Sequence, residues 1–177
     1  VITMRNDQPG ERKAVEFAKS AGASMTSVTF EPESFQEAVR TAEQLADEFD
    51  VRLGIHNHGG RHWLGNTQML RKVFSDTSGR IGLCLDTAWA IHSGEDPLKM
   101  AMEFRERLYG VHLKDFVFDR AGKPADVIVG RGNLDLRALL MFLQESDFRG
   151  PLILEYEGDA DDPVPSVRQC VQSVRGE

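Results

Sequence analysis

Short runs of apolar residues alternate along the chain with longer segments in which apolar positions recur every three or four residues. The short runs are rich in aliphatic side chains, which is typical of strands buried on both faces of a parallel sheet. They occupy residues 1–4, 25–30, 51–55, 81–86, 108–113 and 151–156. Because a helical segment follows each run, the pattern predicts a single α/β domain of about six strand–helix units over residues 1–177.

The segments between the runs carry the signals of amphipathic helices. Gly22 stands where a helix is expected to end, and Ser34 with Glu37 has the spacing of a capping box. The predicted helices cover residues 11–22, 34–49, 66–76, 96–107, 134–146 and 165–175.

Two architectures fit this alternation: a doubly wound open sheet, or part of a (β/α)8 barrel. A complete barrel takes about 250 residues and eight units, and this chain supplies about six. In both architectures, ligands bind at the carboxyl ends of the strands. Polar residues at those ends are therefore the candidates for chemistry.

Four consecutive strands end in potential metal ligands: His56, Asp86, His112 and Glu155. Since strand ends converge at the mouth of a parallel barrel, these side chains predict a site for one divalent ion of Mn, Co, Mg, Fe or Zn. Such an ion polarises a carbonyl or holds an enediolate while a neighbouring group moves a proton. Each residue also has a structural alternative: a hydrogen-bonded histidine at a strand end, an Asp86 cap on the next loop, or a surface ion pair of Glu155.

Composition narrows the function classes. The net charge is −7 and there is no run of Lys or Arg, which argues against a dedicated nucleic-acid binder. No apolar run approaches the roughly 18 residues of a membrane helix, and the first residues lack the features of a signal peptide. Two widely spaced cysteines indicate a reducing compartment, so we expect a cytoplasmic protein.

Five motifs in order carry a family resemblance: "IHNHGG", "LCLDTAW", "GVHLKD", "VGRGNLDL" and "GPLILEYEGD". Together they resemble the sugar phosphate isomerase/epimerase group of the xylose isomerase-like TIM-barrel superfamily, which also contains endonuclease IV and the inosose dehydratases. The resemblance covers the chain from about residue 10. It implies a (β/α)8 barrel from which the two N-terminal units are missing. We therefore expect either self-association or a further segment to complete the barrel.

The resemblance implies one divalent metal held by Glu, Asp, His and Glu. The last three ligands fall on Asp86, His112 and Glu155, and the first falls on His56, in a His-rich strand like that of the inosose dehydratases. In the epimerases, two metal-bound Glu residues act as opposed acid and base, an arrangement that His56 disrupts.

The catalytic proton acceptor is then expected among Glu155, Glu31 and His58. His58 follows His56 by two residues and shares its face if the strand stays extended.

The resemblance also suggests substrate contacts. Trp89 replaces a family histidine and would stack on a sugar face or pack in the core. Lys114 would contact a substrate phosphate or carboxylate, or lie in solvent, and Arg131 lies in a "GxGxxD"-like loop where it would reach an anionic substrate. Asn57 is a further candidate contact, whereas His62 is read as a loop residue.

These features predict a metal-dependent isomerase or epimerase of a sugar, keto-sugar or sugar phosphate. The reaction would be proton abstraction next to a carbonyl, through a metal-stabilised enediolate. One alternative is a lyase of the inosose-dehydratase type. Another is a sugar-binding or interaction protein without activity. Endonuclease chemistry on DNA is disfavoured by the acidic charge, and the sequence names neither the sugar nor the metal.

Overall fold

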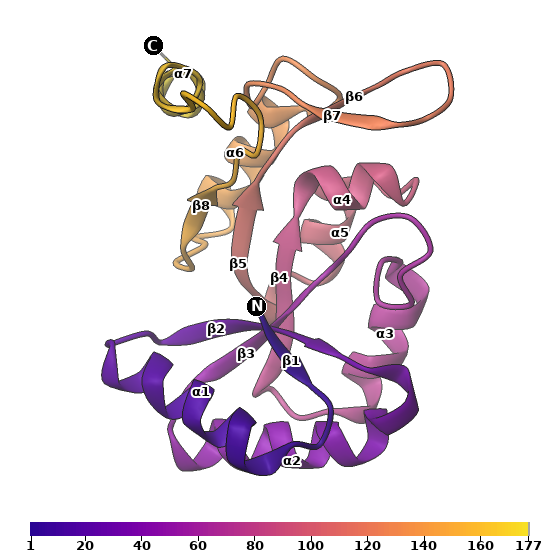
Figure 1. The fold of residues 1–177 in the computed structure, drawn as a ribbon, viewed down its shortest axis with the longest axis vertical. Helices are drawn as coiled ribbons and strands as arrows, with labels where there is room; N and C mark the ends of the chain where they lie inside the picture. The colour runs from indigo at the N-terminus through magenta and orange to yellow at the C-terminus, as the bar shows by residue number, and fades with distance from the viewer. Residues whose placement is uncertain (177) are drawn as a thin grey trace.

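The computed structural model describes residues 1–176 and contains one parallel sheet of six strands (Figure 1). Neighbouring strands follow chain order: β1 (Ile2–Met4), β2 (Met25–Phe30), β3 (Arg52–His56), β4 (Ile81–Asp86), β5 (Leu108–Leu113) and β8 (Leu152–Leu154). The six strands confirm the six predicted runs. Strictly sequential parallel pairing, with helices between the strands, is the connectivity of a (β/α) barrel wall.

Helices connect the strands at the places that the apolar periodicity predicts. They are α1 (Gln8–Ser20), α2 (Phe35–Glu48), α3 (Thr67–Asp76), α4 (Thr87–His92), α5 (Pro97–Glu103), α6 (Leu136–Glu145) and α7 (Val164–Arg175), with 3₁₀ turns η1 (Pro32–Ser34) and η2 (Arg105–Arg107). The apolar periodicity does not predict the short helix α4. It begins directly at the end of β4, so it belongs to the candidate site.

An antiparallel hairpin, β6 (Phe116–Phe118) and β7 (Pro124–Asp126), projects from the end of β5. Figure 1 places this hairpin and α7 at the end of the molecule away from α1 and α2. The hairpin therefore rises beyond the carboxyl end of the sheet.

Of two sequence signals for the ends of helices, one is confirmed and the other is wrong. Gly22 has a φ of +81° just after α1, as a helix-ending glycine should. The capping box at Ser34 is wrong, because the Ser34 side chain makes no capping hydrogen bond within residues 1–176. The 3₁₀ turn η1 already curves the backbone at Ser34, away from the extended conformation of an N-cap, and Glu37 pairs with Arg40 instead.

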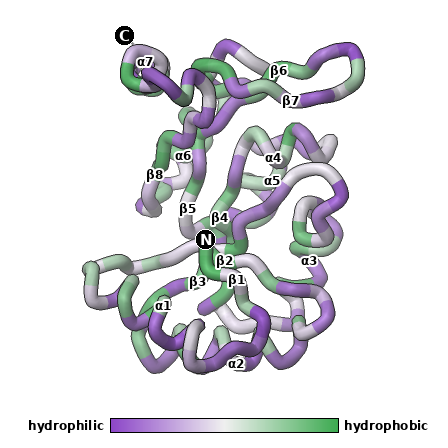
Figure 2. The backbone as a smooth tube through the Cα atoms, in the orientation of Figure 1, coloured by the Kyte–Doolittle hydropathy of each residue, from purple (hydrophilic) through white to green (hydrophobic). Residues whose placement is uncertain are grey.

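The core lies between the sheet and the helices. Its innermost side chains come from alternate strand positions and are fully buried. They include Val28, Leu53, Ile55, Leu83 and Val111. In Figure 2, hydrophobic stretches gather where β1 to β4 meet, and hydrophilic positions dominate the outer side of α2. Burial of this apolar surface is the main stabilising contribution to the fold.

The sheet is open in the part of the chain that the structure describes, since β1 and β8 form its two edges. On β8, Leu152 and Ile153 are 43% and 40% exposed. Apolar side chains on an unpaired strand edge favour association. Among residues 1–176, no helix is long and apolar enough to cross a bilayer.

Candidate metal centre

Four side chains from neighbouring strands converge at the carboxyl end of the sheet. His56 ends β3, Asp86 ends β4, His112 is paired in register with Asp86 on β5, and Glu155 follows β8. One potential ligand atom from each lies within 4.8 Å of all the others. The structure thus brings together the four residues that the strand ends predicted.

Asp86 is the most deeply buried member of this cluster. Its Oδ1 accepts a hydrogen bond of 2.8 Å from the Trp89 amide and so caps α4. Its Oδ2 is buried without a hydrogen-bond partner among the described residues and lies 3.6 Å from Nε2 of His56. Since buried carboxylate oxygens are normally satisfied, this oxygen is available to a cation. Asp86 therefore combines its capping role with an unsatisfied atom that faces the cluster.

Asn57 fixes the position of Asp86 rather than facing a substrate. Its side-chain carbonyl accepts from the Asp86 amide at 2.7 Å, and its side-chain amide donates to the Asp86 carbonyl at 2.9 Å. Asn57 is fully buried between β3 and β4. The predicted contact of Asn57 with substrate finds no support in this geometry.

His112 and Glu155 form the other half of the cluster. Nδ1 of His112 lies 2.6 Å from Oε2 of Glu155. The Cys84 sulfur and the Glu155 carboxylate, both beside the imidazole, raise the pKa of His112 to about 10. In return, the His112 hydrogen bond and then the Lys114 ammonium lower the pKa of Glu155 to about 2. In the absence of a metal, a proton shared between His112 and Glu155 holds the pair together, and a bound cation would displace this proton.

The donor set suits a divalent transition metal. Two imidazoles and two carboxylates are typical ligands for Zn²⁺, Co²⁺, Fe²⁺ or Mn²⁺, whereas Mg²⁺ prefers oxygen ligands alone. The unsatisfied Oδ2 of Asp86 and the close approach of the four groups also fit such an ion.

A cavity of ≈ 330 Å³ opens over the cluster. Its lining residues come from β1, β2, the end of β3 and the loop after it, α4, and the segment after β8. They include Thr3, Thr29, His56, His58, His62, Trp89, Glu155 and Glu157. The rings of His58 and Trp89 are stacked, with centroids 4.6 Å apart. Burial, and then the neighbouring His56, lower the pKa of His58, which keeps this imidazole neutral near pH 7.

The remaining predicted residues lie in different surroundings. Trp89 lines the cavity and packs edge-on against Phe116, and its stacking on a sugar face stays a prediction. Glu31 pairs with Arg5 at 3.5 Å and is not among the residues lining the cavity. His62 lies in a loop, as the sequence predicts, and its ring centroid is 5.7 Å from that of His58.

Lys114 is fully buried, so the alternative that it lies in solvent is wrong, while its contact with a substrate stays a prediction. Its ammonium donates to Oε1 of Glu155 at 2.8 Å and to Glu157. Glu157 was not singled out as a functional residue, although "EYE" spaces it two residues from Glu155, a spacing that puts both on one face of an extended chain.

Arg131 lies on a loop whose shape is set by Asp115. The buried Asp115 carboxylate accepts hydrogen bonds from the backbone amides of Gly130, Gly132, Asn133 and Leu134. At Gly132 a Cβ would come within 2.4 Å of Asp115 Oδ1, which explains the glycine. Arg131 itself is exposed and does not line the cavity over the cluster.

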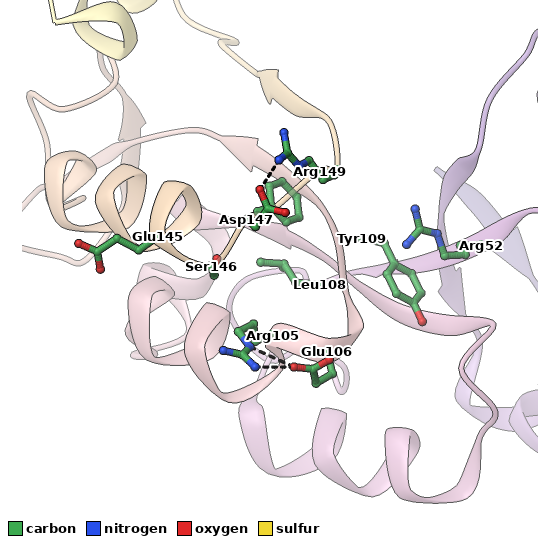
Figure 3. Close-up of a pocket in the computed structure, with 11 residues that line it drawn as sticks. Arg52, Arg105, Glu106, Leu108, Tyr109, Glu145, Ser146, Asp147 and Arg149 are labelled. Carbon is green, nitrogen blue, oxygen red and sulfur yellow. Dashed lines mark hydrogen bonds and ion pairs between the residues drawn. The ribbon is translucent and has the colours of Figure 1, made fainter.

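A second cavity, of ≈ 390 Å³, lies at the opposite end of the sheet (Figure 3). Arg52 and Leu108, which begin β3 and β5, form part of its lining. Arg105 pairs with Glu106 and Arg149 with Asp147, as the dashed lines in Figure 3 show. Arg52 and Glu145 are the other charged residues in the lining, and none of the lining residues belongs to the candidate metal cluster.

Comparisons with known proteins identify the family and the fold of this chain. A family model described as "Xylose isomerase-like TIM barrel" matches residues 12–175. The rhizopine catabolism protein MocC of Rhizobium meliloti is 30% identical over 138 residues, which cover 70% of this chain and 42% of that protein. An inosose dehydratase of Clostridium botulinum is 29% identical over 131 residues, covering 66% and 44%. The chain thus spans less than half the length of these relatives.

A solved structure shows the same fold. The 3-keto-D-glucoside 4-epimerase YcjR of E. coli, in its apo form, superposes with a TM-score of 0.75 at 16% identity. The superposition covers 97% of this chain and 71% of the epimerase.

Proposed function

The chain belongs to the xylose isomerase-like TIM-barrel family, and we propose that it binds one divalent metal and acts on a sugar, keto-sugar or sugar phosphate as an isomerase or epimerase. The observation that carries the proposal is the unsatisfied Oδ2 of Asp86, buried among three other potential ligands. His56, Asp86, His112 and Glu155 would hold the metal. When bound, the metal polarises the substrate carbonyl and stabilises the negative charge that develops on its oxygen.

Proton abstraction next to the carbonyl falls to His58 in this proposal. Glu155 is held between His112 and Lys114, and its low pKa makes it a weak base. Glu31 is paired with Arg5 and lies outside the cavity lining. His58 lines the cavity beside His56, so a substrate carbon above the cluster comes within its reach.

The cavity also suits a small carbohydrate. Its ≈ 330 Å³ lies at the lower end of the usual range for ligand sites, about 300–1,000 Å³. The stacked rings of His58 and Trp89 form one wall, and aromatic faces pack well against the C–H face of a sugar ring. Thr3, Thr29 and Glu157 offer polar partners for hydroxyl groups on the other walls.

A dehydratase is the second candidate. Two observations favour it: a sequence relative is an inosose dehydratase, and His56 occupies the place of the first family Glu. A lyase shares the proton abstraction and then expels a hydroxyl group as water, so it does not need two opposed carboxylates.

One experiment tests both proposals. The protein is loaded with Mn²⁺, Co²⁺ or Zn²⁺ and incubated with candidate keto-sugars and inososes in deuterated water. Deuterium uptake next to the carbonyl without loss of water supports the isomerase or epimerase, whereas net dehydration supports the lyase. A protein that takes up none of these metals would contradict both and leave a carbohydrate-binding role.

A further inference from the structure

Lys114 is the one buried cation that contacts the candidate metal ligands in the part of the chain that the structure describes. Its side chain is 1% exposed, although it lies only two residues beyond His112. Burying an ammonium is costly unless carboxylates surround it. The position of Lys114 therefore has to be explained by what it contacts.

The ammonium is surrounded by carboxylates and aromatic rings. It lies 2.8 Å from Oε1 of Glu155, contacts Oε2 of Glu157, and is 3.9 Å from Oδ1 of Asp126 on β7. It also lies 5.6 Å from the ring centroids of Trp89 and Phe116. An ammonium has three donors, and these groups enclose it on several sides. Little of it remains accessible to a substrate anion.

The main chain of Lys114 is held as firmly as its side chain. The Thr87 hydroxyl, at the start of α4, accepts from the Lys114 amide at 3.0 Å and donates to the Lys114 carbonyl. The site of attachment of the side chain is therefore fixed relative to Asp86, the neighbour of Thr87. A fixed lysine is suited to orienting another group.

Glu155 uses its two oxygens differently. Lys114 binds Oε1, while Oε2 lies 2.6 Å from His112 within the cluster. We propose that Lys114 is a positioning residue that holds Oε1 of Glu155, so that Oε2 stays directed at the metal position between His56, Asp86 and His112. This inference rests on the proposed metal site, and it replaces the predicted substrate contact of Lys114.

Two opposite effects make the idea testable. A positive charge near a metal site weakens cation binding by repulsion, so removing it strengthens binding if charge alone matters. Losing an orienting contact to a ligand instead typically weakens metal binding by about 10-fold to 100-fold. Positioning and simple repulsion thus predict changes of opposite sign.

The experiment is a Co²⁺ titration of the full chain, followed by calorimetry and by the visible absorption of the bound ion. The variants are Lys114→Met, Lys114→Arg and, as the matched control, Lys123→Met, which makes the same change at an exposed position of the β6–β7 turn. Positioning predicts that K114M loses about 10-fold to 100-fold in affinity and alters the position or intensity of the absorption bands. K114R should recover part of both, and K123M should match the wild type.

Circular dichroism checks that each variant is folded, and Lys114→Gln replaces K114M if the methionine variant fails to fold. Unchanged or tighter Co²⁺ binding by folded K114M, with unchanged bands, would overturn the positioning role alone. Absence of Co²⁺ binding by the wild type would instead overturn the proposed metal site, and the positioning role with it.

Discussion

Asp86 and Trp89 are linked by a hydrogen bond that involves only one of the two oxygens of the Asp86 carboxylate. The Trp89 amide donates to Oδ1 of Asp86, and the other oxygen is buried and unsatisfied among the described residues. The same contact starts α4, and the Trp89 ring on this helix lines the cavity beside His58. The Asp86 side chain therefore links the start of α4, the candidate metal position and the cavity wall formed by Trp89 and His58.

Replacement of Asp86 by asparagine separates its two roles. Asparagine caps helices about as well as aspartate, so we expect Asp86→Asn to lower the unfolding free energy by less than about 1 kcal/mol in the absence of metal. Divalent metal binding should fall by at least about 100-fold, since a buried anionic ligand is lost. Urea unfolding and isothermal titration of the same preparation measure the two effects. Asp96→Asn, at the equivalent cap of α5, is the control and should leave metal binding unchanged.

The stability of the metal-free protein should depend on pH through His112 and Glu155. The pKa of His112 rises from 6.5 to about 10 on folding, so its stabilising effect is full below pH 6.5 and is lost as the pH rises toward 10. The pKa of Glu155 falls from 4.5 to about 2, so its effect is full above pH 4.5 and is lost as the pH falls toward 2.

These two titrations predict a maximum in unfolding free energy between about pH 4.5 and pH 6.5. Urea unfolding across pH 3–9 with a chelator present measures it. The variant His112→Asn should lose the decline above pH 6.5, and a decline of the same size in that variant would show that other groups cause it.

The loop that carries Arg131 should depend on Asp115. This buried carboxylate accepts hydrogen bonds from four backbone amides, and a hydrogen bond to a charged group makes a net contribution of about 1.5–3 kcal/mol. Asp115→Ala is therefore expected to lower the unfolding free energy by at least about 3 kcal/mol. Asp119→Ala, an exposed aspartate that accepts from two amides in the hairpin turn, should cost about 1 kcal/mol or less. Equal costs for the two variants would contradict the anchoring role of Asp115.

Self-association through the open sheet edge is a further expectation. Leu152 and Ile153 on β8 are exposed beside an unpaired strand edge, and such edges pair with other chains. Sedimentation should show species larger than the 19.8 kDa chain, and Ile153→Lys should shift the protein toward the monomer. Met102→Lys also replaces an exposed apolar side chain with a positive charge, on α5 rather than on β8, and should have no such effect. A compact, stable monomer of the unmodified chain would contradict the expectation.

The residues of the candidate cluster were predictable because parallel strands impose a simple rule. Once the apolar runs are assigned to neighbouring strands, their carboxyl ends meet, and His56, Asp86, His112 and Glu155 follow from their places in the sequence. The family resemblance also implies that His56 stands where relatives usually have a Glu, and this stays a prediction.

Contacts that depend on side-chain direction were not predictable. The ion pair of Lys114 with Glu155 joins residues 41 positions apart, and nothing near Lys114 in the sequence specifies that its ammonium is buried. The role of Asn57 depends in the same way on the Asp86 backbone of the adjacent strand. At Ser34, a 3₁₀ turn replaced the expected cap, because the backbone before a helix is set by the packing of the preceding loop.

The most direct test of the candidate metal centre is a calorimetric titration of the chelator-treated protein with Zn²⁺, Co²⁺, Mn²⁺ and Mg²⁺ in turn. Two imidazoles and two carboxylates predict one ion bound per chain, with Zn²⁺ and Co²⁺ tighter than Mn²⁺ and Mg²⁺ weakest. Each tight binding event should also release a proton from the His112–Glu155 pair, which is measured by repeating the titration in buffers of different ionisation enthalpy. Saturable binding in that order with proton release supports the centre, whereas the absence of binding by all four ions would contradict it.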